Sequence, residues 1–129
     1  GQAPTLTFRE AVLAGLASDG GLYVPETIPV FSHAEMEALK TASYVDLAYA
    51  VISRFIDEAY VPADVLKKII TESYATFRHA DVAPVKEIDG LHVLELFHGP
   101  TLAFKDFALQ FLGRLLGHIF ASSNEHATV

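Results

Sequence analysis

The chain has 129 residues, enough for one ordinary domain, and its 51% hydrophobic content and mean hydropathy of +0.31 exclude a disordered segment. Its net charge of -7, without any cluster of Lys and Arg, argues against a nucleic-acid partner. Cysteine is absent, which excludes a disulfide framework, and no uncharged apolar run reaches the roughly 18 residues that a membrane span needs. So apolar a composition indicates that part of the surface meets another domain or chain.

The first predicted element is a short amphipathic helix at residues 8–17. Its apolar residues recur at helical spacing from Phe8 onward. Thr7 is the expected N-cap, and Glu10 stands three residues later in the capping-box position. A cluster of Ser, Asp and Gly at residues 18–21 is typical of a turn and should end the helix.

Three further helices are predicted in the first part of the chain. Ser32 should cap a helix at residues 33–40, with Glu35 in the capping-box position. A second helix is expected at residues 44–57, and Pro62 suits the first turn of a third. Their charged residues fall on outer faces, so we interpret them as a packed helical layer without chemistry. A binding surface for a partner helix stays open as an alternative.

The periodicity changes near residue 81. Residues 82–88 and 91–97 are two strand candidates, and the Asp-Gly pair at residues 89–90 between them is a strong hairpin signal. We therefore predict a mostly helical N-terminal domain at residues 1–80. Residues 81–129 are predicted to begin a mixed α/β domain with a hairpin followed by a long helix.

One lysine stands out in the predicted long helix, at residues 103–121. Lys105 projects from its apolar side, and a helix with so little polar surface is usually buried. The positive end of the helix dipole also lies close to it. Both effects disfavour the ammonium form, and a neutral amine is a nucleophile that forms Schiff bases. On periodicity alone, a lysine that only extends its charge into solvent stays an open alternative.

The turn before this lysine is interpreted mainly as conformational. Gly99 is expected to adopt an unusual φ, and Pro100 to fix the entry into the helix. Asp106 either orients a site group or simply favours the helix N-terminus electrostatically, and we favour the second interpretation. None of the six histidines forms an i, i+4 pair with another, and no nucleophile elbow, Walker loop or dinucleotide fingerprint occurs. We therefore predict no metal site.

Two stretches of the chain resemble a known family. The stretch that contains the lysine reads His98-Gly99-Pro100-Thr101-Leu102-Ala103-Phe104-Lys105-Asp106-Phe107. It resembles the lysine segment of fold-type II pyridoxal-phosphate (PLP) enzymes, although many of those have small residues where this chain has Leu102 and Ala103. The full string is similar to the threonine synthase family, and residues 6–26 are similar to the start of that family. Together the two stretches span the chain nearly end to end.

The resemblance implies a PLP-dependent enzyme that converts O-phospho-L-homoserine and water to L-threonine and phosphate, a carbon–oxygen lyase reaction on a phosphate ester. Lys105, matched to the family's Schiff-base lysine, would hold the cofactor and then act as general base at the substrate α-carbon. Phe104 and Phe107 would pack near this lysine and keep it desolvated. His98 is a further candidate for lining the cofactor site because it lies close to Lys105.

The resemblance also implies that this chain is an N-terminal fragment. The family's glycine-rich loop for the cofactor phosphate is expected just after Val129, so the missing part of the catalytic domain is the fragment's main partner. Alone, the fragment should have no turnover and should bind PLP weakly. A cytoplasmic location fits the composition. Two alternatives stay open: another fold-type II enzyme, either a dehydratase or a threonine-synthase-like phospho-lyase, and a non-enzymatic helical interaction module.

Overall fold

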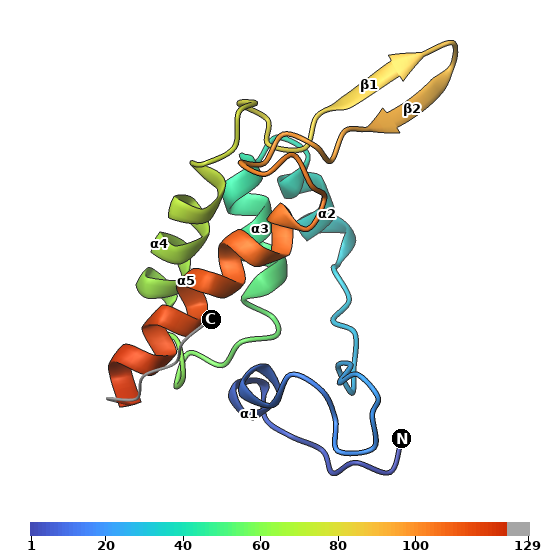
Figure 1. The fold of residues 1–129 in the computed structure, drawn as a ribbon. Helices are drawn as coiled ribbons and strands as arrows, with labels where there is room; N and C mark the ends of the chain where they lie inside the picture. The colour runs from blue at the N-terminus through green and yellow to red at the C-terminus, as the bar shows by residue number, and fades with distance from the viewer. Residues whose placement is uncertain (124–129) are drawn as a thin grey trace.

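The computed structural model describes residues 1–123, and within them it has five helices and one two-stranded antiparallel sheet. Figure 1 shows α3, α4 and α5 side by side, with the hairpin projecting from one end of this cluster. The elements are α1 (Phe8–Ala14), α2 (His33–Leu39), α3 (Tyr44–Ile52), α4 (Ala63–Tyr74), β1 (Val85–Ile88), β2 (Leu91–Leu94) and α5 (Asp106–Ser123). The predicted mixed class, helical first and then a hairpin and a long helix, is confirmed.

Both predicted capping boxes are present. Thr7 accepts a hydrogen bond from the backbone N–H of Glu10, whose side chain in turn accepts from the N–H of Thr7. Ser32 and Glu35 make the same reciprocal pair at the start of α2. These pairs satisfy N–H groups that a helix start otherwise leaves free.

Helix α1 is shorter than predicted, ending at Ala14 instead of residue 17. Gly15 has a φ of 69° and leaves the helical path. The next residues form a small turn, in which Leu16 bridges Leu22 and the N–H of Ala17 donates to the carbonyl of Gly21 at 2.9 Å. Pairing across the turn thus replaces the helical hydrogen bonds of these residues.

Helix α3 also ends early, at Ile52. The N–H of Phe55 donates to the carbonyl of Ile52 at 3.0 Å, a tighter turn than an α-helix makes. Asp57 then caps a turn by accepting from the N–H of Ala59 at 2.9 Å. Pro62 sits one residue before α4, at its N-cap, so its lack of an N–H costs the helix nothing.

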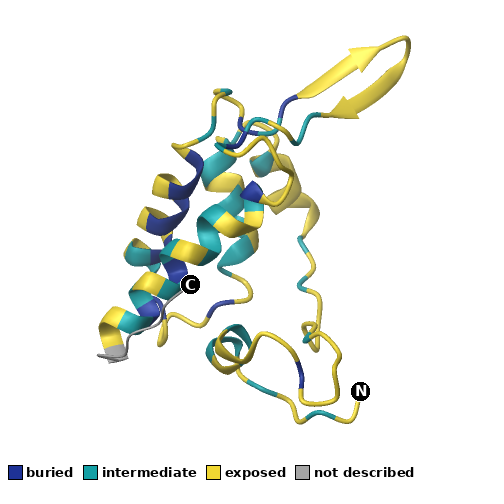
Figure 2. Cartoon of the chain, in the orientation of Figure 1, coloured by how far each residue is buried: buried dark blue, intermediate teal, exposed yellow. Residues whose placement is uncertain are grey.

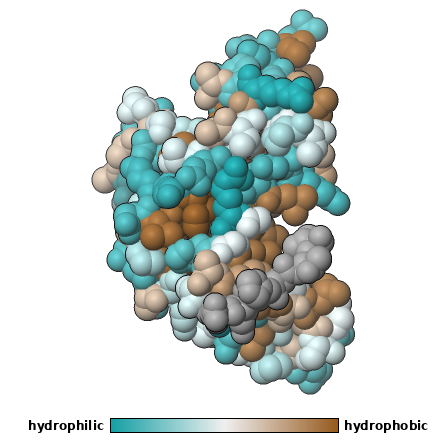
Figure 3. Space-filling model, turned by 60° about the vertical axis from the view of Figure 1, so that its left-hand side comes forward, coloured by the Kyte–Doolittle hydropathy of each residue, from teal (hydrophilic) through white to brown (hydrophobic). Residues whose placement is uncertain are grey.

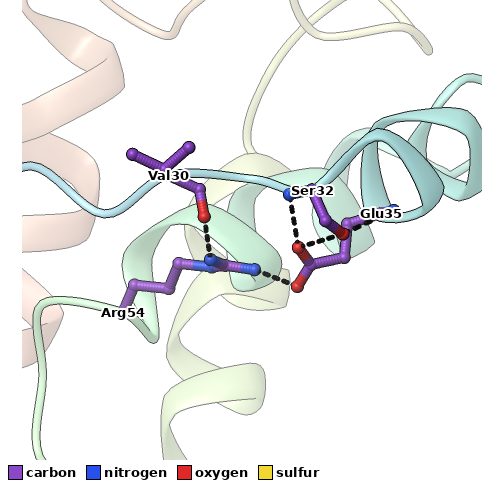
Figure 4. A network of polar contacts seen from close by, with 4 residues as sticks. All are labelled: Val30, Ser32, Glu35 and Arg54. Atoms are coloured by element: carbon purple, nitrogen blue, oxygen red, sulfur yellow. Dashed lines mark hydrogen bonds and ion pairs between the residues drawn. The ribbon is translucent and has the colours of Figure 1, made fainter.

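A close polar network joins α2 to the end of α3 (Figure 4). One guanidinium nitrogen of Arg54 donates to the carbonyl of Val30 at 3.0 Å, and the other pairs with the carboxylate of Glu35. The guanidinium also lies 3.8 Å from the ring centroid of Phe31. Hydrogen bonds from Ser32, and then from Arg54, lower the pKa of Glu35 to about 2. Although this network is largely exposed, it fixes where α2 begins.

The hydrophobic core lies where α4 meets α3 and α5, and most of its buried residues belong to α4 and α5 (Figure 2). An aromatic cluster continues it, with Phe77 and Phe107 rings 4.9 Å apart and Tyr44 and Tyr74 also 4.9 Å apart. The buried core residues are Ile56, Val61, Leu66, Ile69, Ile70, Tyr74, Val82, Leu115 and Ile119. Because they come from both sides of residue 80, the two predicted domains share one core, and the boundary itself stays a prediction.

The hairpin forms at the predicted Asp-Gly turn. Asp89 and Gly90 have φ values of 50° and 78°, the two positive values that a type I′ turn requires. Both strands are shorter than predicted, since Val82 has a φ of 59° and Pro84 has no N–H for a ladder. All eight strand residues are exposed, including Val85, which pairs with Leu94. A two-stranded sheet of this size is marginal in water by itself.

Among the described residues, no helix is long and apolar enough to cross a membrane.

Candidate functional site

Lys105 lies in the turn immediately before α5. Its carbonyl accepts hydrogen bonds from the N–H of Leu109 at 2.9 Å and of Ala108 at 3.1 Å, so its backbone begins the helix. The side chain is exposed, and within residues 1–123 it forms no ion pair. The expectation of a buried lysine is therefore wrong for this chain. The helix predicted to carry the apolar face is present, but no described residue covers that face at Ala108 and Leu109, which are exposed too.

A compact turn at residues 99–105 positions this lysine. The N–H of Leu102 donates to the carbonyl of Gly99 at 3.1 Å, and the N–H of Asp106 donates to the carbonyl of Ala103 at 3.0 Å. Leu102 has a φ of 64°, which is unfavourable for a residue with a side chain. Contacts around the turn must therefore stabilise this conformation.

The carboxylate of Asp106 makes the main stabilising contacts. One oxygen, Oδ2, accepts from the N–H of Thr101 at 2.8 Å, and Oδ1 accepts from the Thr101 hydroxyl at 2.9 Å. Asp106 is only 2% exposed. The prediction that it mainly favours the helix electrostatically missed these contacts. The only signal in the sequence is an acceptor five residues after a Thr, which is too common to be diagnostic.

Gly99 is required here for space rather than for its φ, which corrects the sequence interpretation. Its φ is not in the positive region, where only Gly15, Gly20 and Gly90 lie among the described glycines. A Cβ at Gly99 would lie 2.3 Å from Oδ2 of Asp106 and 2.4 Å from its Cβ. Any larger residue would therefore displace the buried carboxylate.

Arg78 ties this turn to the segment that follows α4. Its N–H donates to the carbonyl of His98 at 2.8 Å, and its guanidinium donates to the carbonyl of Pro100 at 3.2 Å. Helix α5 is held in the same way: the Tyr74 hydroxyl donates to the carbonyl of Phe107 at 3.2 Å, and Ser73 to that of Gln110 at 3.1 Å. The helical layer thus contacts the backbone on both sides of Lys105.

The other predicted site residues have contacts or exposures of their own. His98 is hydrogen bonded through Nε2 to Glu95 at 2.7 Å, and its ring lies 4.9 Å from that of His79. Phe104 is 65% exposed. Phe107 belongs to the core aromatic cluster. Lys105 is exposed among the described residues, so the packing of these two phenylalanines near it in the complete protein stays a prediction.

The structure also has an open groove that does not include the lysine turn. This groove of about 1280 Å³ is lined by residues of the first 26 positions together with Phe55, and its lining includes none of Lys105, His98 and Phe104. Asp19 is one of the lining residues, and its carboxylate accepts hydrogen bonds from the N–H groups of Gln2 and Gly21. Among the described residues, no group of three or more His, Asp or Glu is placed to hold a metal ion.

The helical layer, the hairpin and the lysine turn together define a fold found in solved threonine synthases. The PLP-bound threonine synthase from Brucella melitensis superposes with a TM-score of 0.90 at 46% identity, over 98% of this chain and 27% of that one. The sequence family described as threonine synthase N terminus matches residues 1–74, and the chain belongs to this family.

Curated relatives agree. Threonine synthase from Pseudomonas aeruginosa is 52% identical over the whole chain, which aligns with 28% of that protein. Threonine synthase from Schizosaccharomyces pombe is 48% identical over 96% of the chain and 24% of its own length. The chain thus spans about a quarter of the length of the curated relatives that it matches. The predicted family is confirmed, whereas the roles of Lys105, His98 and Phe104 stay predictions.

Proposed function

We propose that this chain is the N-terminal part of a threonine synthase, which converts O-phospho-L-homoserine and water to L-threonine and phosphate with PLP as its cofactor. The observation that carries the proposal is the turn that presents Lys105, built within a fold that matches a PLP-bound threonine synthase at a TM-score of 0.90. The complete enzyme would be a carbon–oxygen lyase.

The residues present fit one part of a PLP site. Lys105 offers an exposed amine without an ion-pair partner among the described residues, on a backbone fixed by a buried carboxylate. The cofactor phosphate needs backbone N–H groups of a glycine-rich loop, and the 129 residues contain none. This chain would therefore supply the lysine that attaches the cofactor covalently. The remaining three quarters of the protein would supply the groups that bind the cofactor phosphate.

When bound, PLP would supply an electron sink that stabilises negative charge at the substrate α-carbon. Lys105 would first hold the cofactor and, once released by the substrate amine, would remove the α-proton with its neutral Nζ. The turn at residues 99–105 would keep this nitrogen near the α-carbon in both roles.

The apolar surface around Lys105 supports burial by the rest of the protein. Leu102, Phe104 and Leu109 are all more than half exposed. Figure 3 shows that apolar surface is open to solvent in several places on the face that it draws. Covering the surface near Lys105 would exclude water and favour the neutral amine.

The proposal is tested by borohydride trapping with PLP on the full-length protein, followed by peptide mass mapping. We expect one reduced phosphopyridoxyl adduct, on Lys105, and its loss in Lys105→Arg but not in the control Lys86→Arg, which changes an exposed lysine of β1. Labelling scattered over several surface lysines, or none, would contradict the proposal.

A dehydratase or a phospho-lyase that does not form threonine is the alternative, because it would share the lysine. Product analysis separates them: with O-phospho-L-homoserine we expect threonine and phosphate in equal amounts, whereas a keto acid would indicate the alternative. We expect residues 1–129 alone to give neither product, and robust turnover by that fragment would contradict the fragment assignment.

A further inference from the structure

We infer that Asp106 is a positioning residue for the reaction: its carboxylate locks the turn at residues 99–105 and so sets the direction of the Lys105 amine. This inference rests on the proposed function. It assigns a role to a buried acidic group that lies next to the lysine in sequence but points away from the exposed surface.

The burial of the two neighbours separates their roles. Asp106 is 2% exposed, and both of its carboxylate oxygens are engaged by Thr101. Lys105, the residue before it, is exposed. A carboxylate so enclosed does not reach a substrate held at the lysine, so Asp106 acts through the backbone rather than on reacting atoms.

The carboxylate is buried without a salt bridge to any described cation. Such a group is costly unless hydrogen bonds satisfy it. Two hydrogen bonds from Thr101 and the positive end of α5 compensate for the lost solvation. The side chain of Asp106 therefore acts inside the fold, where its two hydrogen bonds close a short loop from residue 101 to residue 106.

This loop carries strain that the contact must hold. Leu102, inside it, has a φ of 64°, which a side chain disfavours. Without the Asp106 carboxylate, one N–H and one hydroxyl of Thr101 lose their acceptor, and Leu102 is free to relax to a negative φ. Because Lys105 lies only three residues later, immediately before α5, relaxation of the turn redirects its side chain.

Gly99 provides a second, independent way to disturb the same contact. A Cβ at this position would lie 2.3 Å from Oδ2 and 2.6 Å from Cγ of Asp106. The Gly99→Ala substitution should therefore expel the carboxylate from its place and reproduce the effect of removing it.

The test uses the full-length protein, prepared without PLP and then mixed with it. Asp106→Ala removes both hydrogen bonds. Asp106→Asn keeps both, since the amide oxygen accepts from the Thr101 N–H and the amide nitrogen donates to the Thr101 hydroxyl. Thr101→Val removes only the hydroxyl bond, and Thr101→Ser keeps it. Asp46→Ala, which removes an exposed aspartate of α3, is the control for loss of an acidic group.

Three readouts are followed: the rate at which a borohydride-reducible link to Lys105 forms, kcat and KM with O-phospho-L-homoserine, and amide hydrogen exchange of residues 99–105. We expect Asp106→Ala and Gly99→Ala to lower the linking rate and kcat by about 10- to 100-fold with KM little changed, the size of effect that misplacement by about 1 Å produces. Exchange of the Thr101 amide should rise in both.

The conservative variants complete the test. Asp106→Asn should stay within about threefold of wild type, and Thr101→Val should lie between wild type and Asp106→Ala. If Asp106→Ala fails to fold, the question is decided by comparing Thr101→Val with the two variants that keep the hydrogen bonds, Thr101→Ser and Asp106→Asn. Wild-type linking rate and kcat in Asp106→Ala, in Thr101→Val or in Gly99→Ala would overturn the inference. Damage in Asp106→Asn equal to that in Asp106→Ala would also overturn it.

The proposed function can fail separately. If the wild-type protein forms no link to PLP at Lys105, the proposed function is wrong. If it forms that link and the Asp106 variants form it equally fast, only the positioning role is wrong.

Discussion

The Ile70→Ala substitution tests whether residues 1–129 contain a self-sufficient core. Ile70 is fully buried on α4, between α3 and α5, within the main hydrophobic cluster. The substitution removes three carbon atoms, and at about 0.8 kcal/mol for each buried methylene this lowers the free energy of unfolding by about 2.4 kcal/mol. The cavity left behind raises the expected loss into the range of about 2–5 kcal/mol.

The assay is urea unfolding of the 129-residue polypeptide, followed by far-ultraviolet circular dichroism. Ile70→Val removes a single carbon and should cost about 0.5–1.5 kcal/mol. Lys68→Ala, on the exposed face of the same helix, should change the unfolding free energy by no more than about 0.5 kcal/mol. The graded order of the three variants would show that packing, and not helix propensity, determines the loss.

Two results would refute this reasoning. An Ile70→Ala variant no less stable than Lys68→Ala would mean that α4 does not pack as described. Absence of any cooperative transition in the wild-type polypeptide would mean that the core at α3, α4 and α5 forms only in the presence of the rest of the protein.

Three further predictions concern single groups. Hydrogen bonds from Ser32 and Arg54 lower the pKa of Glu35 to about 2. The contribution of Glu35 to stability is therefore complete above the unfolded pKa of 4.5 and is lost as the pH falls toward 2. Glu35→Gln should remove the Glu35 contribution to the acid transition that circular dichroism follows. Burial raises the pKa of Tyr44 from 10.0 to about 12, so the contribution of Tyr44 to stability is complete below pH 10 and is lost as the pH rises through 12. Burial also raises the pKa of Tyr74, so tyrosinate absorbance should show two late-titrating groups, of which Tyr44→Phe removes one. Gly90→Ala should destabilise the hairpin by about 1 kcal/mol through its φ of 78° alone, because nothing lies within 4 Å of the added Cβ; hydrogen exchange of β1 and β2 would measure this loss.

The parts of the fold that could be predicted depend on contacts between residues close in sequence. The capping boxes at Thr7 and Ser32 join residues three positions apart. The hairpin turn needs positive φ at two adjacent residues, and an Asp-Gly pair is well suited to it. Helix ends were predicted less well, since α1 and α3 stop where turn contacts replace the helical ones.

The candidate site was only partly predictable for the opposite reason. The string around Lys105 identifies the family, but which group holds the turn depends on side-chain direction. Asp106 suits a helix start, and only the structure shows that it turns back to Thr101. Gly99 was expected for its φ, whereas the structure shows a missing Cβ that makes room for a carboxylate. The exposure of Lys105 depends on which residues cover α5. The sequence periodicity of α5 does not show whether those residues belong to this chain.

The contacts between α4 and the lysine segment give the helical layer a mechanical role. Tyr74 and Ser73 donate to carbonyls of α5 after Lys105, and Arg78 donates to the carbonyls of His98 and Pro100 before it. The lysine turn is therefore held at both ends by one helix and the loop that follows it. A substitution that shifts α4 should thus alter the direction of the lysine even without touching it, which separates this layer from a merely appended domain.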